Sequence, residues 1–174
     1  ALRRVPLVQA FQSAIDTLGL PGHVIATDVN AYSPAVHVAD RAYGVPMATE
    51  PGYIDALLDI CKAERVALVV PTIDDELTVI GDARERFRQI GAFVACSPAA
   101  TAEACNDKYE TCARLTALGI PAAKTWLPHE LPASSEFPLF IKPRVGRGAV
   151  DAHVLRDGRD LAYYLGCIEA PIIQ

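Results

Sequence analysis

The stretch VALVVPT at residues 66–72 decides the fold class of this chain. It is a short apolar run that closes at a proline and a threonine, which is typical of a strand buried in a parallel sheet. Apolar residues recur at helical spacing both before and after it. They are Ile54, Leu57, Leu58 and Cys61 on one side, and Leu77, Ile80, Ala83, Phe87 and Ile90 on the other. A buried strand between two amphipathic helices indicates an α/β domain.

Further strands and a helix extend this pattern. HVIATDVN at 23–30 and AFVACS at 92–97 are strand-like, and residues 5–18 form a helical pattern that Gly19 closes. The alternation predicts a parallel sheet with right-handed crossovers. It stops near Ser97, where we place a domain boundary between residues 1–97 and 98–174.

The second region predicts a smaller α+β unit. Residues 98–119 are helical with a break at Asn106-Asp107, and Ser97-Pro98 is a good helix start. FPLFIKP at 137–143 is strand-like, and residues 152–155 are expected to be the return strand of a hairpin.

Composition narrows the class of protein. The 174 residues are 51% hydrophobic and 21% charged, which is typical of a globular core. A net charge of -5 disfavours nucleic acid as a partner. No apolar run is long enough to span a membrane and no signal-peptide pattern is present, so we expect a cytoplasmic protein. The five cysteines show no C-x-x-C spacing, which favours reduced thiols, and no metal site is predicted.

The strongest local signal is the run KPRVGRGAV at residues 142–150. A strand delivers Lys142 to a loop that carries two arginines and two glycines. Glycines let backbone N–H groups approach an anion closely, so the loop is a candidate phosphate cradle. The alternative is an exposed hairpin with ordinary basic residues, because such short motifs recur by chance.

A second signal is Lys108, directly after Asn106-Asp107 at the start of a helical stretch. A lysine in the first helical turn opposes the helix dipole, so a bound phosphate would explain its position. The alternative is a solvated surface lysine.

Together these features resemble the ATP-grasp superfamily, in particular its carbamoyl-phosphate-synthase large-subunit-like members. An α/β domain is followed by a helix that opens with Asp107-Lys108 and closes at Gly119-Ile120-Pro121. A strand that ends in Lys142-Pro143 and a glycine loop come next. The resemblance covers essentially the whole chain. It implies a Rossmann-like pre-ATP-grasp domain followed by the smaller, N-terminal part of an ATP-grasp domain.

The resemblance also implies a set of nucleotide-binding residues. Lys108 and Lys142 are expected to bind ATP, residues 146–150 to form a flexible loop over its phosphates, and Gln174 to lie just before the adenine hinge. The full expected set is Lys108, Lys142, Arg144, Gly146, Arg147, Gly148, Ala149, Val150 and Gln174. The family loop often carries serine where Ala149 stands, so one side-chain donor is missing here.

The chemistry implied is transfer of a phosphoryl group from ATP to a small-molecule carboxylate, which gives an acyl phosphate for attack by an amine. The residues that bind Mg²⁺ in the family lie in a later subdomain, beyond residue 174. We therefore expect the full-length parent to be a ligase and this fragment alone to be inactive. The sequence assigns no catalytic residue and does not name the acid or the amine.

Asp75 and Glu76 are candidate substrate contacts in the first region, because ligands of open α/β sheets bind beyond the carboxyl ends of strands. The alternative is that these acids stabilise the start of the next helix.

Other interpretations stay open. Asp28 ends a strand where a ribose-binding acid could sit, which allows a Rossmann-type dinucleotide-binding module, although Arg3-Arg4 stand where its glycine fingerprint would be. A non-catalytic domain of a larger synthetase is a third possibility. A homodimer is compatible with the sequence. We expect truncation at both ends, because the α/β pattern opens with a helix at Val5, and the last strand breaks off at Gln174.

Overall fold

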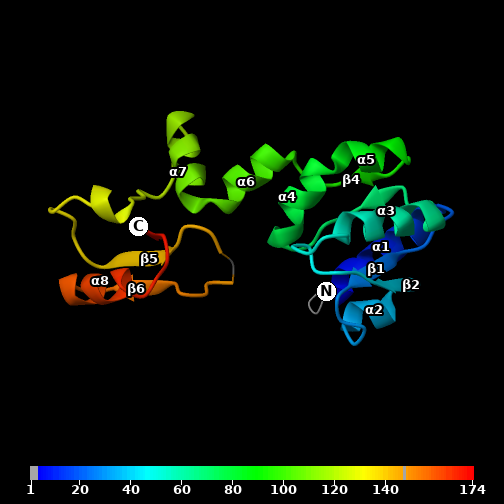
Figure 1. The fold of residues 1–174 in the computed structure, drawn as a ribbon, viewed down its shortest axis with the longest axis horizontal. Helices are drawn as coiled ribbons and strands as arrows, with labels where there is room; N and C mark the ends of the chain where they lie inside the picture. The colour runs from blue at the N-terminus through cyan, green and yellow to red at the C-terminus, as the bar shows by residue number, and fades with distance from the viewer. Residues whose placement is uncertain (1–3, 147) are drawn as a thin grey trace. The chain divides into compact units, whose positions relative to one another are not determined.

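The computed structural model describes residues 4–146 and 148–174. It divides into two compact units, Ala1–Ala99 (unit 1) and Ala100–Gln174 (unit 2). Figure 1 shows the elements of both units. Among the described residues, no helix is long and apolar enough to cross a membrane.

Unit 1 alternates helices with short parallel strands. The strands form two pairs, β1 with β2 and β3 with β4. In chain order the elements are α1 (Val5–Leu18), β1 (Ile25–Asp28), α2 (Pro34–Val38), β2 (Arg41–Gly44), α3 (Tyr53–Glu64), β3 (Leu68–Val69), α4 (Asp74–Asp82), α5 (Arg84–Gln89) and β4 (Phe93–Val94). The predicted α/β fold class is confirmed.

The ends of α1 follow from its sequence. Pro6 occupies the first turn, where its missing N–H costs nothing. Gly19 ends the helix in the left-handed conformation with φ 61°, and its N–H donates to Asp16 O. The predicted helix over residues 5–18 is confirmed.

Two details of unit 1 differ from the sequence prediction. The helix expected from Leu77 to Ile90 is interrupted at Ala83, which separates α4 from α5. The pair α2 and β2 was not predicted. β2 contains no apolar run and its residues are mostly exposed, so hydrophobic periodicity carries no signal for it.

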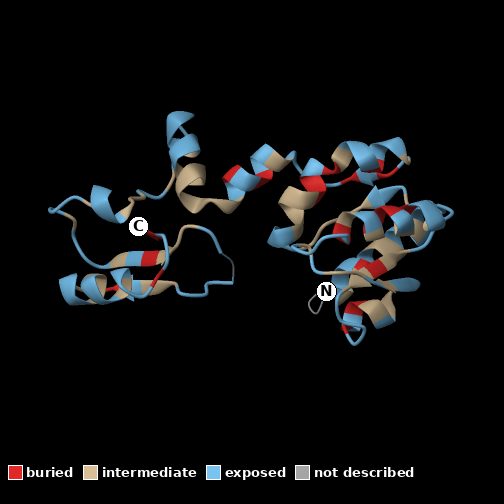
Figure 2. Cartoon of the chain, viewed as in Figure 1, coloured by how far each residue is buried: buried red, intermediate tan, exposed pale blue. Residues whose placement is uncertain are grey.

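The core of unit 1 lies between α3, α4, α5 and β4. Phe87 and Ile80 are its most deeply buried large side chains, and Leu57, Leu58 and Val94 pack with them. Figure 2 shows the buried positions along these elements. This packing holds α4, whose first turn carries one of the predicted sites.

Unit 2 is built on a three-stranded antiparallel sheet in the order β6-β5-β7. Trp126 extends the sheet by one bridge, because its backbone exchanges hydrogen bonds of 2.9 Å with Ile173. The elements are α6 (Ala99–Asn106), α7 (Lys108–Ala117), the 3-10 turn η1 (Pro128–Glu130), β5 (Leu139–Pro143), β6 (His153–Leu155), α8 (Gly158–Leu165) and β7 (Pro171–Ile173). The predicted break at Asn106-Asp107 and the predicted hairpin are confirmed.

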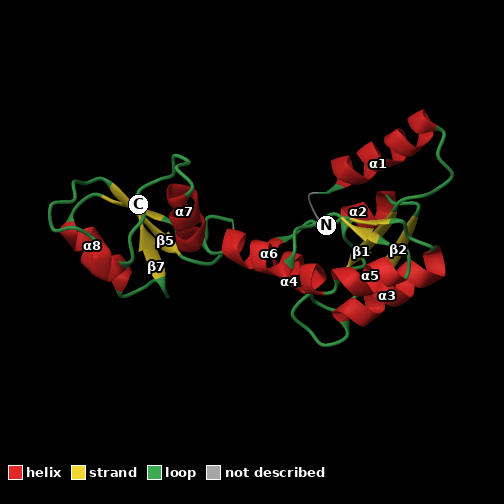
Figure 3. Cartoon of the chain, turned by 90° about the horizontal axis from the view of Figure 1, so that it is seen from above, coloured by secondary structure: helices red, strands yellow, loops and turns green. Residues whose placement is uncertain are grey.

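The two faces of this sheet have different neighbours. Ile141, Leu155 and Ile173 are fully buried on one face and pack with residues of α8. Figures 1 and 3 show α8 on that side of the sheet and α7 on the other side. Lys142 and Phe140 alternate with Ile141 along β5, so they lie on the opposite face, where Phe140 is exposed and Lys142 is half-buried.

Candidate functional site

Lys142 lies on a sheet face that combines positive charge with exposed apolar surface. Phe140 is 37% exposed and pairs with Val154, which is 45% exposed. Lys142 Nζ lies 5.8 Å from the centroid of the Phe140 ring. A flat apolar ring next to an ammonium group suits a ligand that has an aromatic part and an anionic part. The sequence prediction missed Phe140 and Val154, whose exposure only the pairing of β5 with β6 reveals.

The two glycines of the loop after β5 adopt backbone conformations that favour glycine. Gly146 has φ 141° and Gly148 has φ 68°, values that residues with a side chain rarely adopt. Ala149 also has a positive φ of 58°. Gly146, Gly148, Ala149 and Val150 are all exposed. Their backbone is therefore open to a ligand, while Arg147 lies outside the described residues.

Lys108 reaches this loop from the start of α7. Its Nζ donates to Gly146 O at 2.8 Å and to Arg144 O at 3.4 Å. Its backbone N–H donates to Arg144 O at 3.0 Å. Two predicted site residues that are 38 positions apart, Lys108 and Gly146, are thus in direct contact.

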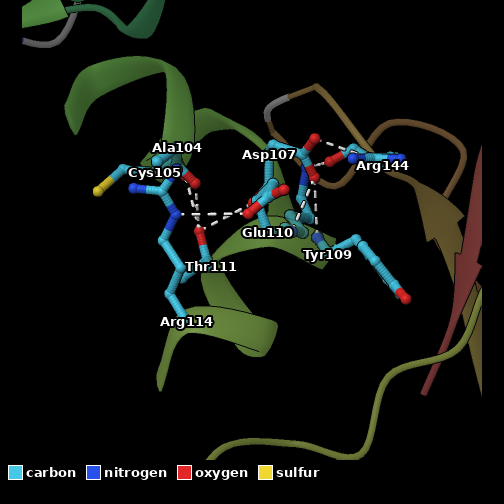
Figure 4. Close-up of polar contacts among 9 residues, drawn as sticks. Ala104, Cys105, Asp107, Tyr109, Glu110, Thr111, Arg114 and Arg144 are labelled. Carbon is cyan, nitrogen blue, oxygen red and sulfur yellow. Dashed lines mark hydrogen bonds and ion pairs between the residues drawn. The ribbon is translucent and has the colours of Figure 1, made fainter. Parts of the chain in front are cut away.

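Asp107 connects the same helix to the base of the loop. Its Oδ1 accepts hydrogen bonds from the N–H groups of Tyr109 and Glu110, so it caps α7. Its Oδ2 lies 2.7 Å from Arg144 Nε. Figure 4 shows Arg144 and the start of α7 meeting at this carboxylate. The guanidinium of Arg144 also lies over the Tyr109 ring, 5.2 Å from its centroid.

Tyr109 is held in turn by the turn η1. Its hydroxyl donates to Glu130, whose carboxylate also accepts the N–H of Leu127 at 2.9 Å. The hydrogen bond to Glu130 raises the pKa of the Tyr109 hydroxyl. The N–H of Leu127, and then the hydroxyl of Tyr109, lower the pKa of the Glu130 carboxyl. The aromatic support under Arg144 is therefore itself fixed.

Gln174 lies at the end of β7, on the opposite side of β5 from the hairpin strand β6. Its backbone exchanges hydrogen bonds with Phe140, and its side-chain amide donates to Thr125 Oγ1 at 2.9 Å. An open hollow of about 640 Å³ lies beside it, between α7 and the segment 119–126. Lys142 and the loop glycines do not line this hollow.

The acidic pair of unit 1 is divided by the structure. Glu76 accepts a hydrogen bond from the N–H of Thr72 and another from the hydroxyl of Tyr53, both at 3.0 Å. Its carboxylate thus closes the first turn of α4. Asp75 is exposed on the same turn. A small hollow of about 290 Å³ next to this turn is lined by Arg4, Leu7, Leu77 and residues 71–74.

The structure therefore brings together Lys108, Arg144 and the loop glycines, with Lys142 on the adjoining strand. It places Asp75 and Glu76 in the other unit. Within residues 4–146 and 148–174, no group of three or more His, Cys, Asp or Glu side chains could hold a metal ion.

Comparisons with known proteins agree with this architecture. The family model described as "PylC-like, N-terminal domain" matches residues 1–95. No curated protein sequence matches the chain.

Solved structures match across both units. The N5-carboxyaminoimidazole ribonucleotide synthetase of Thermus thermophilus matches with a TM-score of 0.68 and 20% identity, over 97% of this chain and 44% of that chain. An L-amino acid ligase of Bacillus licheniformis matches with a TM-score of 0.69 and 16% identity, over 95% and 40%. A biotin carboxylase of Campylobacter jejuni, solved as a complex with β-γ-ATP, matches with a TM-score of 0.68 and 13% identity, over 92% and 38%.

The chain spans less than half the length of each of these proteins. At such identities the matches show the fold. The predicted likeness to the ATP-grasp superfamily is confirmed. The family match covers more than half of the 174 residues, and the chain belongs to the family of PylC-like N-terminal domains.

Proposed function

We propose that the chain is the ATP-binding portion of an ATP-dependent carboxylate–amine ligase. The reaction would proceed through an acyl phosphate, as in the carbamoyl-phosphate-synthase-like enzymes that the sequence resembles. In this proposal residues 1–97 are the pre-ATP-grasp domain and residues 98–174 are the first part of the ATP-grasp domain. The partners are a small-molecule carboxylate and an amine.

One observation carries the proposal. Lys108 Nζ lies 2.8 Å from Gly146 O, so an ammonium group from α7 meets a glycine loop that leaves the strand carrying Lys142. Two ammonium groups beside open backbone N–H groups suit a polyphosphate, because each group favours negative charge and little reorganisation is needed. The loop donors would be Gly146, Gly148, Ala149 and Val150.

The apolar surface beside Lys142 supports a nucleotide over a simple phosphate. The exposed Phe140 and Val154 offer a flat contact for a base, and Gln174 is bonded to Phe140 through its backbone. ATP would supply the phosphoryl group that activates the acid. The residues of this chain would bind its base, neutralise its phosphates and exclude water. ATP would bind together with Mg²⁺, as the resemblance implies.

Asp75 and Glu76 enter the proposal differently. Exposed Asp75 is proposed to face the substrate beyond β3. The carboxylate of Glu76 accepts hydrogen bonds from Thr72 and Tyr53, so Glu76 would act by holding the loop between β3 and α4. Both acids stay candidates for the carboxylate or amine partner.

A binding screen of the full-length protein tests the function. Calorimetry should show binding of ATP with Mg²⁺ and no binding of NAD. Binding of NAD alone would favour a dinucleotide-binding module. Binding of neither nucleotide would favour a non-catalytic domain of a larger synthetase.

A further inference from the structure

We propose that Asp107 and Arg144 form a positioning pair, which holds Lys108 and the glycine loop in the arrangement that binds the nucleotide. This role rests on the proposed function, which it deepens. Arg144 then acts through other residues and is not itself a phosphate ligand.

The pair joins two segments through one carboxylate. Asp107 Oδ1 caps α7 through the N–H groups of Tyr109 and Glu110, while Oδ2 binds Arg144 Nε at 2.7 Å. The side chains of Asp107 and Arg144 are 19% and 32% exposed, so water screens their attraction only in part. The beginning of the helix and the beginning of the loop are therefore fixed to the same carboxylate.

The backbone also connects the two segments, with the helix as donor and the loop as acceptor. Arg144 O accepts the N–H of Lys108 at 3.0 Å, which satisfies a donor that the first turn of a helix normally leaves unpaired. Lys108 follows Asp107 directly, so these bonds place its backbone beside residues 144–146, within reach of its own ammonium group. Its contacts with Arg144 O and Gly146 O follow from this geometry.

The surroundings of Arg144 explain why it is a positioning residue. Its guanidinium has an anionic partner in Asp107 and an aromatic partner in Tyr109, which Glu130 holds in place. A phosphate would have to compete with both partners. Arginine suits this role because its planar group can bind a carboxylate at its edge and stack on a ring with its face.

The direction in which Asp107→Asn changes the affinity for ATP shows whether Arg144 is a phosphate ligand or a positioning residue. Asp107→Asn keeps a side-chain oxygen that can cap α7 but removes the negative charge beside Arg144. If Arg144 were a phosphate ligand, this variant would free it and bind ATP as tightly as the native protein or more tightly. If Arg144 positions Lys108 and the loop, the same variant binds ATP more weakly.

The experiment compares Asp107→Asn, Arg144→Gln and the double variant in the full-length protein. We expect each single variant to weaken ATP binding about tenfold, and the double variant to be no weaker than the singles, because partners in one interaction are not additive. Arg114→Gln is the matched control. It removes an exposed arginine that is paired with Glu110 on α7, away from the loop, and should leave ATP affinity unchanged.

A second readout needs no nucleotide. The amide proton of Lys108, which is bonded to Arg144 O, should exchange faster with solvent in Asp107→Asn and in Arg144→Gln than in the native protein or in Arg114→Gln. Should Arg144→Gln fail to fold, Arg144→Lys takes its place, with partial loss expected.

The outcomes distinguish the inference from the function on which it rests. A native protein that binds no ATP would refute the proposed function, while exchange at Lys108 still tests the pair. A native protein that binds ATP, with variants unchanged in both affinity and exchange, would refute the positioning pair alone. Additive losses in the double variant would also refute it.

Discussion

At the scale of single residues, Lys142 is the side chain on which ATP binding should depend most directly. It is half-buried on β5, and its ammonium lies 5.8 Å from the ring of the exposed Phe140. Lys142→Ala should weaken ATP binding by about 1.5–3 kcal/mol, the usual worth of a hydrogen bond to a charged group. Calorimetry on the full-length protein measures this change.

Lys62→Ala supplies the control for that variant. Lys62 is an exposed lysine whose nearest anionic partner is Asp59, three residues away on α3. Its loss removes the same charge from unit 1 and should leave ATP affinity unchanged. Equal affinity in the native protein and in Lys142→Ala would remove Lys142 from the site.

Glu64 is a second residue with a testable role, in the stability of unit 1. It ends α3, and its side chain is only 6% exposed. Its carboxylate accepts hydrogen bonds from Tyr43 and Arg41 on β2, and lies 3.2 Å from His23 Nε2. The Tyr43 hydroxyl is the main cause that lowers the pKa of Glu64 below its ordinary value of 4.5.

The lowered pKa predicts a dependence of stability on pH. A carboxyl whose pKa is lowered by folding stabilises the fold above its unfolded-state pKa, and this contribution disappears as the pH falls through the folded-state value. The free energy of unfolding should therefore fall as the pH drops below about 4.5, and Glu64→Gln should fall less steeply. Urea unfolding at a series of pH values measures both slopes, and parallel slopes would contradict the assignment.

At the scale of elements, the packing of α4 depends on Gly81, although glycine has a low helix propensity. A Cβ on Gly81 would lie 2.9 Å from Ser97 O and 2.9 Å from Ala99 N, closer than non-bonded atoms allow. The helix can therefore approach the segment before α6 only without a side chain there. Gly81→Ala should destabilise unit 1 by about 1–3 kcal/mol through overpacking, despite the better helix propensity of alanine.

Gly22→Ala is the matched control for this close approach. A Cβ at Gly22 meets nothing within 4 Å, and its φ is not positive. The free energy of unfolding should change by less than about 1 kcal/mol. Urea unfolding curves measure the free energy of unfolding of Gly81→Ala and Gly22→Ala. Equal stability of the two variants would show that α4 can shift to accommodate the added methyl group.

The elements also show how far the sequence could predict this molecule. Helical periodicity identified α1 and α3, an apolar run identified β5, and the predicted break at Asn106-Asp107 marked the start of α7. Short β2, with mostly exposed residues, gave no apolar pattern. The predicted α/β class and its parallel strands were thus confirmed, but the division of the strands into two separate pairs was not predicted.

The candidate site shows a different limit. Lys108, Lys142 and the loop could be selected because lysines and glycines carry local signals. The contact between Asp107 and Arg144 joins residues 37 positions apart, and the open face around Phe140 depends on strand register. Both features arise only from tertiary structure, so residue patterns could not predict them.

At the scale of the whole molecule, the two units have separate cores. Phe87 is fully buried in unit 1, and Ile141 is fully buried in unit 2. Phe87→Ala should destabilise unit 1 by about 3–5 kcal/mol, and Ile141→Ala should destabilise unit 2 by about 2–5 kcal/mol. Hydrogen exchange resolved by peptide should show each loss confined to its own unit, and equal loss in both units would show that they unfold as one.

The backbone bridge between Trp126 and Ile173 has an optical consequence. Trp126 is the only tryptophan in the 174 residues, and it is partly buried beside β7 in unit 2. Its indole emission therefore reports on unit 2 alone. Ile173, its partner in the bridge, directly precedes Gln174. A ligand that settles near Gln174 should shift or quench that emission, so the chain carries its own fluorescent reporter without any added dye.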